Sequence, residues 1–384
     1  MKLRLATPGP TEVPQRLLLA GAREIIHHRS PEMEALIREI NEGLPPLFGT
    51  DHPVYTIATS GTGAMEAAVA NCFSATDEVL VVSNGYFGER FQAICRNYGL
   101  TVHVVESEWG TSVDPQRVAK AYAQHPGIRG VFVVYSETST GALNDVQAIG
   151  QIFRDTDVVV VVDAISGLLA HPLLMDEWGL DVVLAASHKG FMLPPGLAFI
   201  ALSDKAWTAV ERSSGPTYYW SFERLRHFYP MSSSSPAVSL LLGLHESLKM
   251  LAEEGLPAFQ KRHAALGRAA ERALLALGFT TFIQPPHSRS HVITSALAPE
   301  GIDTSQLLKT LSTQYGLTMT GGQAHLKGKL IRVGHVGAAD ALDLCAVFGA
   351  LEMSLLALGH RFTPGIGVGE VVRTFHESVP STKR

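Results

Sequence analysis

Short apolar runs rich in β-branched residues recur along the first half of the chain, and most of them are followed by a helical pattern. This alternation is typical of a mostly parallel sheet with helical crossover connections. The helix after the first run can be checked by spacing, because Met65, Ala68, Val69, Cys72 and Phe73 form one apolar stripe. The expected strands are 54–59, 78–83, 101–105, 130–135, 158–162, 181–186 and 197–202.

The alternation stops after Pro236. Two long helices hinged at Gly255 are expected there, and shorter strands and helices follow. The first dozen residues are rich in proline and glycine, so we expect no regular element in them and place them at a cleft. The chain is therefore divided into an N-terminal segment (1–15), a large domain (16–255) and a smaller C-terminal α+β domain (256–384).

The composition excludes several classes of function. Hydrophobic residues make up 46% of the chain and charged residues 17%, enough apolar surface for a sizeable core. With 31 basic and 36 acidic side chains, the net charge of −5 argues against nucleic acid or a membrane as partner. No apolar run approaches the ~18 residues of a membrane span, and we expect a soluble, cytoplasmic protein. Three scattered cysteines supply no iron–sulfur or zinc ligand set, so no metal is expected at the functional site.

Ligands of open α/β sheets bind beyond the carboxyl ends of the parallel strands, so polar residues there are candidates. The segment Ser60-Gly61-Thr62-Gly63 lies between the first strand and its helix. Small residues and the free N–H groups of a helix start suit a phosphate, although a simple turn is an alternative. The spacing matches neither a dinucleotide fingerprint nor a P-loop.

Two ionisable residues follow later strands. Asp163 ends a run of five valines, where a buried carboxylate needs a partner, either a cationic ring nitrogen or a helix cap or salt bridge. Lys189 follows the strand 181–186; partial burial would lower its pKa toward the nucleophilic amine, whereas a solvated surface lysine is the alternative. The adjoining His188 is open between a core residue, a ligand and a hydrogen-bond donor to an anion.

Arg332 lies in an apolar β context, where arginine is unusual unless it meets an anion. A structural ion pair is the alternative to a substrate carboxylate. Taken together, a phosphate cradle, an acidic strand end, a lysine and this arginine describe pyridoxal 5′-phosphate chemistry on an amino acid.

The chain also resembles the class V, fold-type I aminotransferases, in particular the alanine/serine–glyoxylate aminotransferase group. The resemblance runs nearly end to end. Its motifs are TPGPTEVP near the start, HRSPEM (28–33), TSGTGAMEAA (59–68), NGYFGER (84–90), SETSTGALND (136–145), VVDAISGL (161–168), SHKGFMLPPGLAF (187–199), SPAVSLLLGLHESL (235–248) and GGQAHLKGKLIRVGHVG (321–337).

The resemblance implies a pyridoxal 5′-phosphate enzyme whose Lys189 forms the Schiff base and whose Asp163 holds the pyridine nitrogen. It implies a mostly parallel seven-stranded sheet in the large domain. Arg332 and Gly9 are expected to bind substrate. The cofactor-binding residues that it implies, besides those two, are Ser60, Gly61, Thr62, Phe87 against the ring, Thr138 near the phenolic oxygen, Ile165 on the other ring face, His188 and Ser235.

Two departures from the family pattern stand out. Relatives commonly have glutamine where this chain has His188, although cysteine desulfurases carry histidine there. Relatives often have a threonine–proline pair that reaches the partner subunit's phosphate. Here the segment is Met231-Ser-Ser-Ser-Ser-Pro236, in which Ser235 is the best match and a flexible loop is the alternative. The resemblance implies a homodimer with shared active sites.

The activity expected is transfer of an amino group from alanine or serine to a 2-oxo acid such as glyoxylate or pyruvate. Aspartate or ureidoglycine as donor is the alternative; a second carboxylate would need another cation, for which Arg29, Arg224 and Arg226 are candidates. A cysteine desulfurase-like lyase is disfavoured because 313–331 contains no cysteine. A non-catalytic redox subunit is a further rival, since some close relatives carry hydrogenase names.

Overall fold

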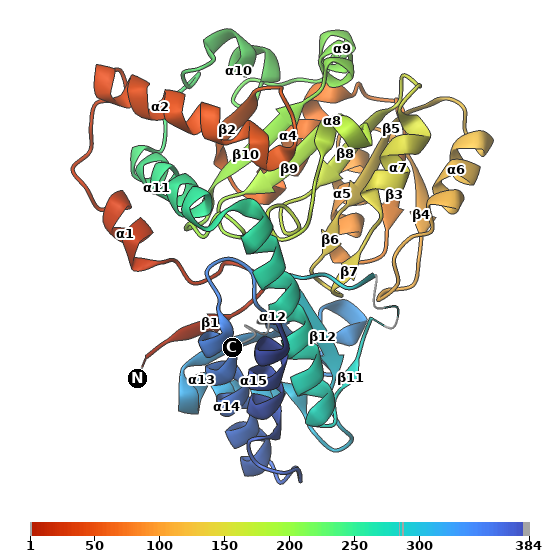
Figure 1. The fold of residues 1–384 in the computed structure, drawn as a ribbon. Helices are drawn as coiled ribbons and strands as arrows, with labels where there is room; N and C mark the ends of the chain where they lie inside the picture. The colour runs from red at the N-terminus through yellow and green to blue at the C-terminus, as the bar shows by residue number, and fades with distance from the viewer. Residues whose placement is uncertain (1, 284, 286–287, 379–384) are drawn as a thin grey trace, which may run out of the picture.

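The structure is a computed structural model that describes residues 2–283, 285 and 288–378. Its larger part is a seven-stranded sheet in the order β2-β10-β9-β8-β5-β3-β4 (Figure 1). Only β10 runs against its neighbours, and the other pairings in this sheet are parallel. The strands are β2 (Val54–Thr59), β3 (Glu78–Ser83), β4 (Thr101–Glu106), β5 (Ile128–Val134), β8 (Val159–Asp163), β9 (Val182–Ala186) and β10 (Gly196–Leu202).

All seven predicted strands are therefore confirmed, with ends that differ by two residues at most. The β-branched runs form strands because they are buried on both faces, as in a parallel sheet covered by helices. Since β8, β9 and β5 are parallel, their carboxyl ends meet at one edge of the sheet. This edge carries Asp163, and it is where Lys189 follows β9.

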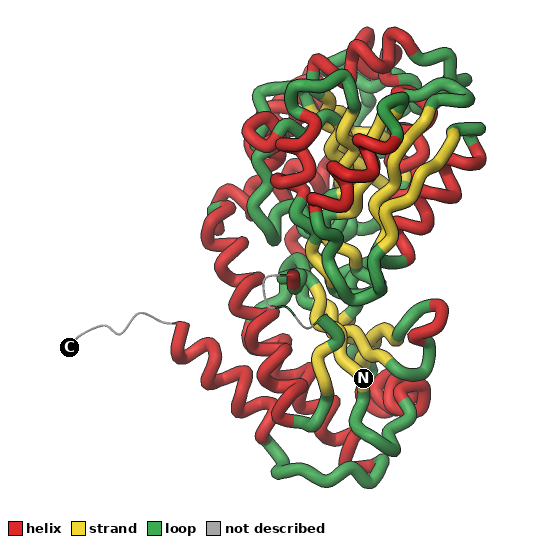
Figure 2. The backbone as a smooth tube through the Cα atoms, turned by 90° about the vertical axis from the view of Figure 1, so that its right-hand side faces the viewer, coloured by secondary structure: helices red, strands yellow, loops and turns green. Residues whose placement is uncertain are grey.

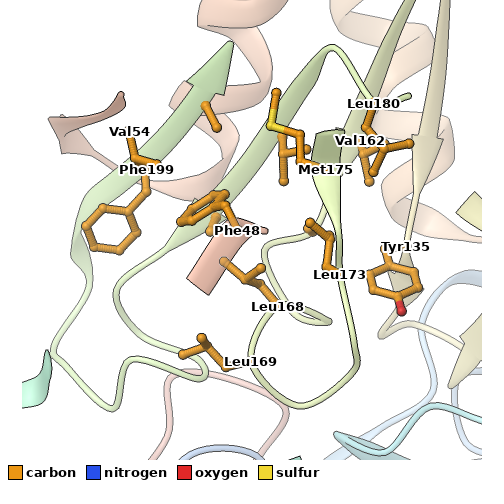
Figure 3. Close-up of a cluster of buried hydrophobic side chains, with 14 of the residues drawn as sticks. Phe48, Val54, Tyr135, Val162, Leu168, Leu169, Leu173, Met175, Leu180 and Phe199 are labelled. Atoms are coloured by element: carbon orange, nitrogen blue, oxygen red, sulfur yellow. The ribbon is translucent and has the colours of Figure 1, made fainter. Parts of the chain in front are cut away.

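Helices cover both faces of the large sheet. On one face Phe48 packs with Phe199, Val54 and Leu168 in a continuous apolar layer (Figure 3). The helices that cover the face with Phe48 are α1 (Gln15–Gly21), α2 (Pro31–Gly43), α3 (Pro45–Phe48), α6 (Pro115–Gln124), α7 (Val146–Phe153), α8 (Met175–Trp178) and α11 (Val238–Glu254), and those on the other face are α4 (Gly61–Cys72), α5 (Tyr86–Asn97), α9 (Asp204–Arg212) and α10 (Phe222–Phe228). No helix in the described part of the chain is long and apolar enough to cross a membrane.

A second sheet has the order β1-β13-β14-β12-β11 and packs against its own helices, beside the large sheet (Figures 1 and 2). The hinge expected at Gly255 is present, with φ +79 between α11 and α12. The elements of this part are β11 (Thr280–Thr281), β12 (Ile293–Leu297), β13 (Leu317–Gly321), β14 (Leu330–Gly334), α12 (Leu256–Ala276), α13 (Thr304–Tyr315), α14 (Ala341–Ala357), α15 (Ile366–Ser378) and a short 3-10 turn, η2 (Ala324–Leu326).

The expectation that the first dozen residues form no regular element was wrong for β1 (Arg4–Ala6), which pairs in parallel with β13 of the second sheet. The prolines begin only at Pro8, so the residues before them keep the N–H groups that a strand needs. Gly334 makes this path possible, because a Cβ there would lie 2.1 Å from the backbone of Thr7. The chain thus starts in the second sheet, although the domain limits given above stay a prediction.

Candidate active site

A cavity of about 230 Å³ opens at the carboxyl edge of the large sheet. Residues from six separate stretches of the chain line it, most of them following strands of the sheet. The cavity contains nine of the residues expected from the sequence, namely Gly9, Ser60, Gly61, Thr62, Phe87, Asp163, Ile165, His188 and Lys189, together with Met65, Arg90, Val134, Ser136 and Ser166.

The floor of the cavity at β2 is the start of α4. Ser60 caps this helix, and its Oγ accepts a hydrogen bond from the N–H of Gly63 at 3.3 Å. A Cβ on Gly61 would lie 2.7 Å from Cδ1 of Ile165, so a larger residue would fill the space above the first helical N–H groups. A helix start that borders a cavity with its N–H groups suits an anion, which favours the phosphate interpretation over a simple turn.

Asp163 is a buried carboxylate with few partners. It is 4% exposed, its Oδ1 accepts from the N–H of Ile165 at 2.9 Å, and the described residues give it no ion pair. Burial raises its pKa to about 7, and the nearby Glu137 carboxylate adds to that rise, while Lys189 and Arg90 oppose it. A cation placed in the cavity would therefore give Asp163 an ion-pair partner that the described residues do not supply.

Lys189 is equally buried, with 6% of its surface exposed. Its Nζ donates to the carbonyl of Pro8 at 2.6 Å. Burial lowers the pKa of this amine to about 8, with Asp163 acting against the shift and Arg332 adding to it. Gly9 passes so close that a Cβ there would lie 2.5 Å from Nζ, and its φ of +145 also favours glycine. The solvated-surface alternative for this lysine is excluded by its burial.

Arg332 projects from β14 beside the cavity and is 6% exposed. Its Nε donates to the carbonyl of Gly321 at 2.8 Å and its Nη1 to that of Thr138 at 2.6 Å. Among the described residues it has no carboxylate partner within ion-pair distance, so the structural ion pair considered from the sequence is not formed there. Burial lowers its pKa to about 10. A neutral pair of carbonyls thus fixes a guanidinium whose charge remains available to an anion.

Comparison with known proteins places these residues in a family. A model of class V aminotransferases matches residues 10–336. The soluble hydrogenase small subunit of Synechococcus sp. is 37% identical over 97% of this chain and 98% of its own length. The serine–glyoxylate aminotransferase of Methylorubrum extorquens is 34% identical over 95% and 94% of the two chains. The crystal structure of ureidoglycine–glyoxylate aminotransferase from Bacillus subtilis superposes with a TM-score of 0.94 at 26% identity, covering 98% of this chain and 99% of that one.

The chain belongs to the class V aminotransferase family. Membership confirms the resemblance stated from the motifs, and the family's fold type I agrees with the mostly parallel sheet. In this aminotransferase Asp163 ends β8, and Lys189 follows the neighbouring strand β9 by three residues.

Two charged residues of this class V aminotransferase site escaped the sequence reasoning. Glu137 is fully buried, and its Oε2 accepts from the N–H groups of Phe87 and Gly88 at 3.0 and 3.2 Å, which fixes the start of α5. Arg90 stacks over the ring of Phe87 at 4.8 Å, and its Nη1 donates to Oγ1 of Thr62 at 2.7 Å. A signal existed for Glu137, because a carboxylate directly after the buried strand β5 needs a reason.

Two hydroxyl groups beside Arg332 were missed as well. Ser295 and Thr320 stand opposite Arg332 on β12 and β13, so the three side chains share one face of the second sheet. Both hydroxyls are buried and have no hydrogen-bond partner among the described residues. The arginine is therefore flanked by two buried hydroxyls, of which Ser295 lines a second cavity with Gly141 and Arg289.

Ser235 and the candidate second cations lie elsewhere. Ser235 lines a separate pocket with Tyr55, Tyr219 and Tyr229, and the single chain does not bring it to the cavity. Of the three arginines considered for a second carboxylate, Arg226 pairs with Glu211, Arg224 stacks on Tyr218, and none of the three lines the cavity. Their roles as surface charges are therefore favoured.

Proposed function

We propose that this class V aminotransferase uses pyridoxal 5′-phosphate to move an amino group from a small amino acid, serine or alanine, to glyoxylate or pyruvate. One observation carries the proposal. A buried amine with a lowered pKa and a buried carboxylate line one cavity, and a buried guanidinium close enough to affect that amine lies beside it; the described residues give neither the carboxylate nor the guanidinium an ion-pair partner. Each lacks an opposite charge that a pyridinium ring, a phosphate or a substrate carboxylate would bring.

The residues of the cavity fit this cofactor. Asp163 would hold the ring nitrogen, Phe87 and Ile165 would cover the two ring faces, and the start of α4 with Ser60, Gly61 and Thr62 would hold the phosphate. His188 supports the fit, because its Nδ1 is buried and has no partner among the described residues. Burial lowers the pKa of His188 to about 4, so the ring is neutral and able to donate or accept one hydrogen bond.

The chain's own groups then have distinct tasks. When bound, pyridoxal 5′-phosphate supplies the electron sink that makes the α-proton of an amino acid removable. Lys189, with its pKa near 8, is able to accept that proton as the neutral amine and return it. Arg332 would orient the substrate by its carboxylate, which sets the α-carbon relative to Nζ.

The number of cations near the cavity limits how many carboxylates a substrate can carry. Arg332 is a carboxylate-binding cation that the site leaves available, whereas Arg90 is directed to Thr62 at the expected phosphate position. A four- or five-carbon diacid would need a further cation, and Arg29, Arg224 and Arg226 do not line the cavity. Two of the proteins compared above act on glyoxylate by their names, which supports a two-carbon acceptor.

We further propose a cytoplasmic homodimer with shared sites. Ser235 lies outside the cavity of its own chain, in a pocket bordered by exposed Tyr219. A partner that covers this pocket would use the serine-rich segment for its own phosphate site. Analytical ultracentrifugation of the loaded enzyme tests the dimer, and a monomer with full activity would contradict it.

The experiment that decides the substrate is a panel of half-reactions followed by absorbance. The donors are serine, alanine, aspartate and ureidoglycine, and the acceptors are glyoxylate, pyruvate and 2-oxoglutarate. We expect serine or alanine to convert the yellow enzyme fastest, and glyoxylate or pyruvate to restore it. Aspartate faster than both small donors would overturn the substrate proposal while leaving the aminotransferase chemistry intact.

The same preparation tests the two rival functions. A redox subunit, as the name of the Synechococcus relative would have it, should keep its colour when amino acids are added. A lyase of the desulfurase type should release sulfide from cysteine. We expect bleaching by amino acids and no sulfide, because residues 313–331 supply no cysteine before Arg332.

A further inference from the structure

Three side chains of types that can bind metals lie together near the amino end of β3, away from the cavity at the carboxyl ends of the strands. The ligand atoms of Glu78, His103 and His125 all lie within 4.8 Å of one another. Nε2 of His103 is 2.8 Å from Oε2 of Glu78, and the rings of His103 and His125 are stacked at 3.8 Å. Side chains of His103 and Glu78 are 23% and 42% exposed, so an ion from solvent can reach them.

The fold explains why residues so distant in sequence converge. Glu78 starts β3, and His103 lies on the neighbouring edge strand β4, opposite Leu80. The helix α6 packs against both strands, and His125 follows its last residue, Gln124. His125 is held there because its N–H donates to the carbonyls of Ala121 and Tyr122. Three separate elements thus each contribute one donor.

The donor set matches a divalent transition metal. Two imidazoles and one carboxylate are zinc ligands, and they would leave a fourth position for water. Zinc ligands about 2.1 Å from the metal stand about 3.4 Å apart in a tetrahedron. Nε2 of His103 and Oε2 of Glu78 are 2.8 Å apart, which is a hydrogen-bond distance. A bound ion would replace this hydrogen bond, and rotation of the side chains would bring the three ligand atoms, now within 4.8 Å of one another, to the spacing of about 3.4 Å.

Two features of the surroundings favour a cation at this position. The last turn of α6 points its carbonyl end toward His125, and a helix carboxyl end carries partial negative charge. Gly127 passes beside the carboxylate, where a Cβ would lie 3.1 Å from Oε1 of Glu78. A side chain at that position would crowd the carboxylate, and glycine leaves it accessible.

We propose that Glu78, His103 and His125 form a binding site for Zn²⁺ or a similar divalent transition metal that joins β3, β4 and the end of α6. The site lies at the amino end of β3, whereas the cavity lies at the carboxyl ends of the strands. Its function is therefore to tie the edge strand to the helix that covers it. The proposal is independent of the amino-group chemistry proposed above.

The direct test is calorimetric titration of the chelator-treated, cofactor-loaded enzyme with Zn²⁺. We expect one Zn²⁺ per chain that is bound at least tenfold more weakly after His103→Ala, His125→Ala or Glu78→Gln. The matched control is His27→Ala, because His27 also stands beside a second histidine, His28, at 4.7 Å but belongs to no such three-ligand group in the described chain. Equal Zn²⁺ affinity and stoichiometry in the three variants would refute the site.

A second readout separates coordination from a change in folding. Co²⁺ bound by imidazole and carboxylate at a four-coordinate site gives visible absorption bands. We expect these bands in the wild type and in His27→Ala, and their loss in Glu78→Gln, which preserves the shape of the side chain. Zn²⁺ should also raise the melting midpoint of the wild type but not of His125→Ala. Bands of equal strength in Glu78→Gln and His125→Ala would contradict the proposed ligands.

Discussion

Two buried aspartates on adjacent strands have the same exposure and opposite surroundings. Asp163 ends β8, Asp181 directly precedes β9, and each is 4% exposed. Asp181 accepts from the N–H of Val160 at 2.8 Å and from Oγ of Ser203 at 2.7 Å, and it pairs with Nζ of Lys205 at 3.0 Å. Asp163 accepts only the N–H of Ile165 among the described residues. The chain itself therefore satisfies Asp181, whereas Asp163 keeps acceptor capacity that the described residues do not fill.

The two aspartates show that a buried charge can belong either to the packing of the fold or to a binding site. A buried charge that finds its donors within the chain belongs to the fold, because its desolvation is offset in the folded protein. A buried charge without such donors raises the free energy of the ligand-free protein. A ligand of opposite charge removes this cost when it binds. Five experiments test this difference, given in order of decreasing effect.

The largest effect is expected at the two lysines. Lys189→Ala should reduce the rate of transamination at least about 10³-fold, since it removes the amine that moves the proton. Lys205→Ala, the partner of Asp181, should leave kcat within threefold and lower the melting midpoint. Steady-state rates and thermal melts of both variants measure this. Residual transamination by Lys189→Ala near the wild-type rate would disprove its assignment.

Substitution of the two aspartates should affect different properties, kcat for Asp163 and the stability of the fold for Asp181. Asp163→Asn should lower kcat at least about 100-fold, because an amide does not stabilise a protonated ring. Asp181→Asn should leave kcat nearly unchanged but destabilise the fold by about 1–3 kcal/mol, because one amide oxygen cannot serve its three donors. Kinetics and denaturant unfolding of both variants provide the measurement.

The effect of Asp163→Asn on the stability of the cofactor-free protein should depend on pH. Burial raises the pKa of Asp163 from 3.8 to about 7, so the folded state favours the protonated form. Its stabilising contribution is present below pH 3.8 and is lost as pH rises to 7. Asp163→Asn should therefore raise the melting midpoint of the cofactor-free protein at pH 8 and have little effect at pH 4. A lower midpoint at pH 8 would mean that the carboxylate has a partner in the chain.

Arg332→Lys should produce a smaller loss. Lysine keeps the charge but cannot contact Gly321, Thr138 and a carboxylate at once. We expect kcat/KM for serine or alanine to fall about 10–100-fold, mostly through KM, as the loss of about 1.5–3 kcal/mol implies. Melting curves control for folding. A change in kcat alone would argue that the arginine acts on the chemical step.

The smallest effect concerns the pH dependence of cofactor capture. Only a neutral amine at Lys189 would react with the aldehyde that pyridoxal 5′-phosphate supplies, and burial lowers the pKa of this amine from 10.5 to about 8. The association rate of pyridoxal 5′-phosphate should therefore rise about tenfold from pH 6.5 to 7.5 and level off above pH 8.5. Stopped-flow absorbance of the cofactor-free enzyme follows it. A rate that keeps rising to pH 10 would show an unshifted lysine.

Most of the fold could be predicted from periodicity. The seven strands, the helix at Met65 and the hinge at Gly255 followed from local patterns that tertiary contacts then reinforced. The position of β1 could not be predicted, because its partner β13 lies more than 300 residues away and three residues carry little pattern. Nine of the site residues expected from the motifs line one cavity, because the carboxyl ends of the strands of a parallel sheet lie at the same edge.

The rest of the site depended on distances that no local pattern encodes. Whether Asp163 or Asp181 is the unpaired carboxylate depends on Ser203 and Lys205, which lie on a different strand end and helix. Ser295 and Thr320 became visible only through their register with Arg332. The group of Glu78, His103 and His125 could not be predicted either, because a loop and the helix α6 separate the two histidines and no local spacing links them.

The short strand β1 has a consequence for how the two halves of the molecule communicate. Its last residue, Ala6, is bound to the second sheet, and only two residues later the carbonyl of Pro8 accepts from Lys189 at the end of β9. If the second sheet moved relative to the large one, the Pro8 carbonyl would move with β1, and its hydrogen bond to Lys189 would lengthen or break. The hydrogen bonding of this amine would therefore depend on where the second sheet lies.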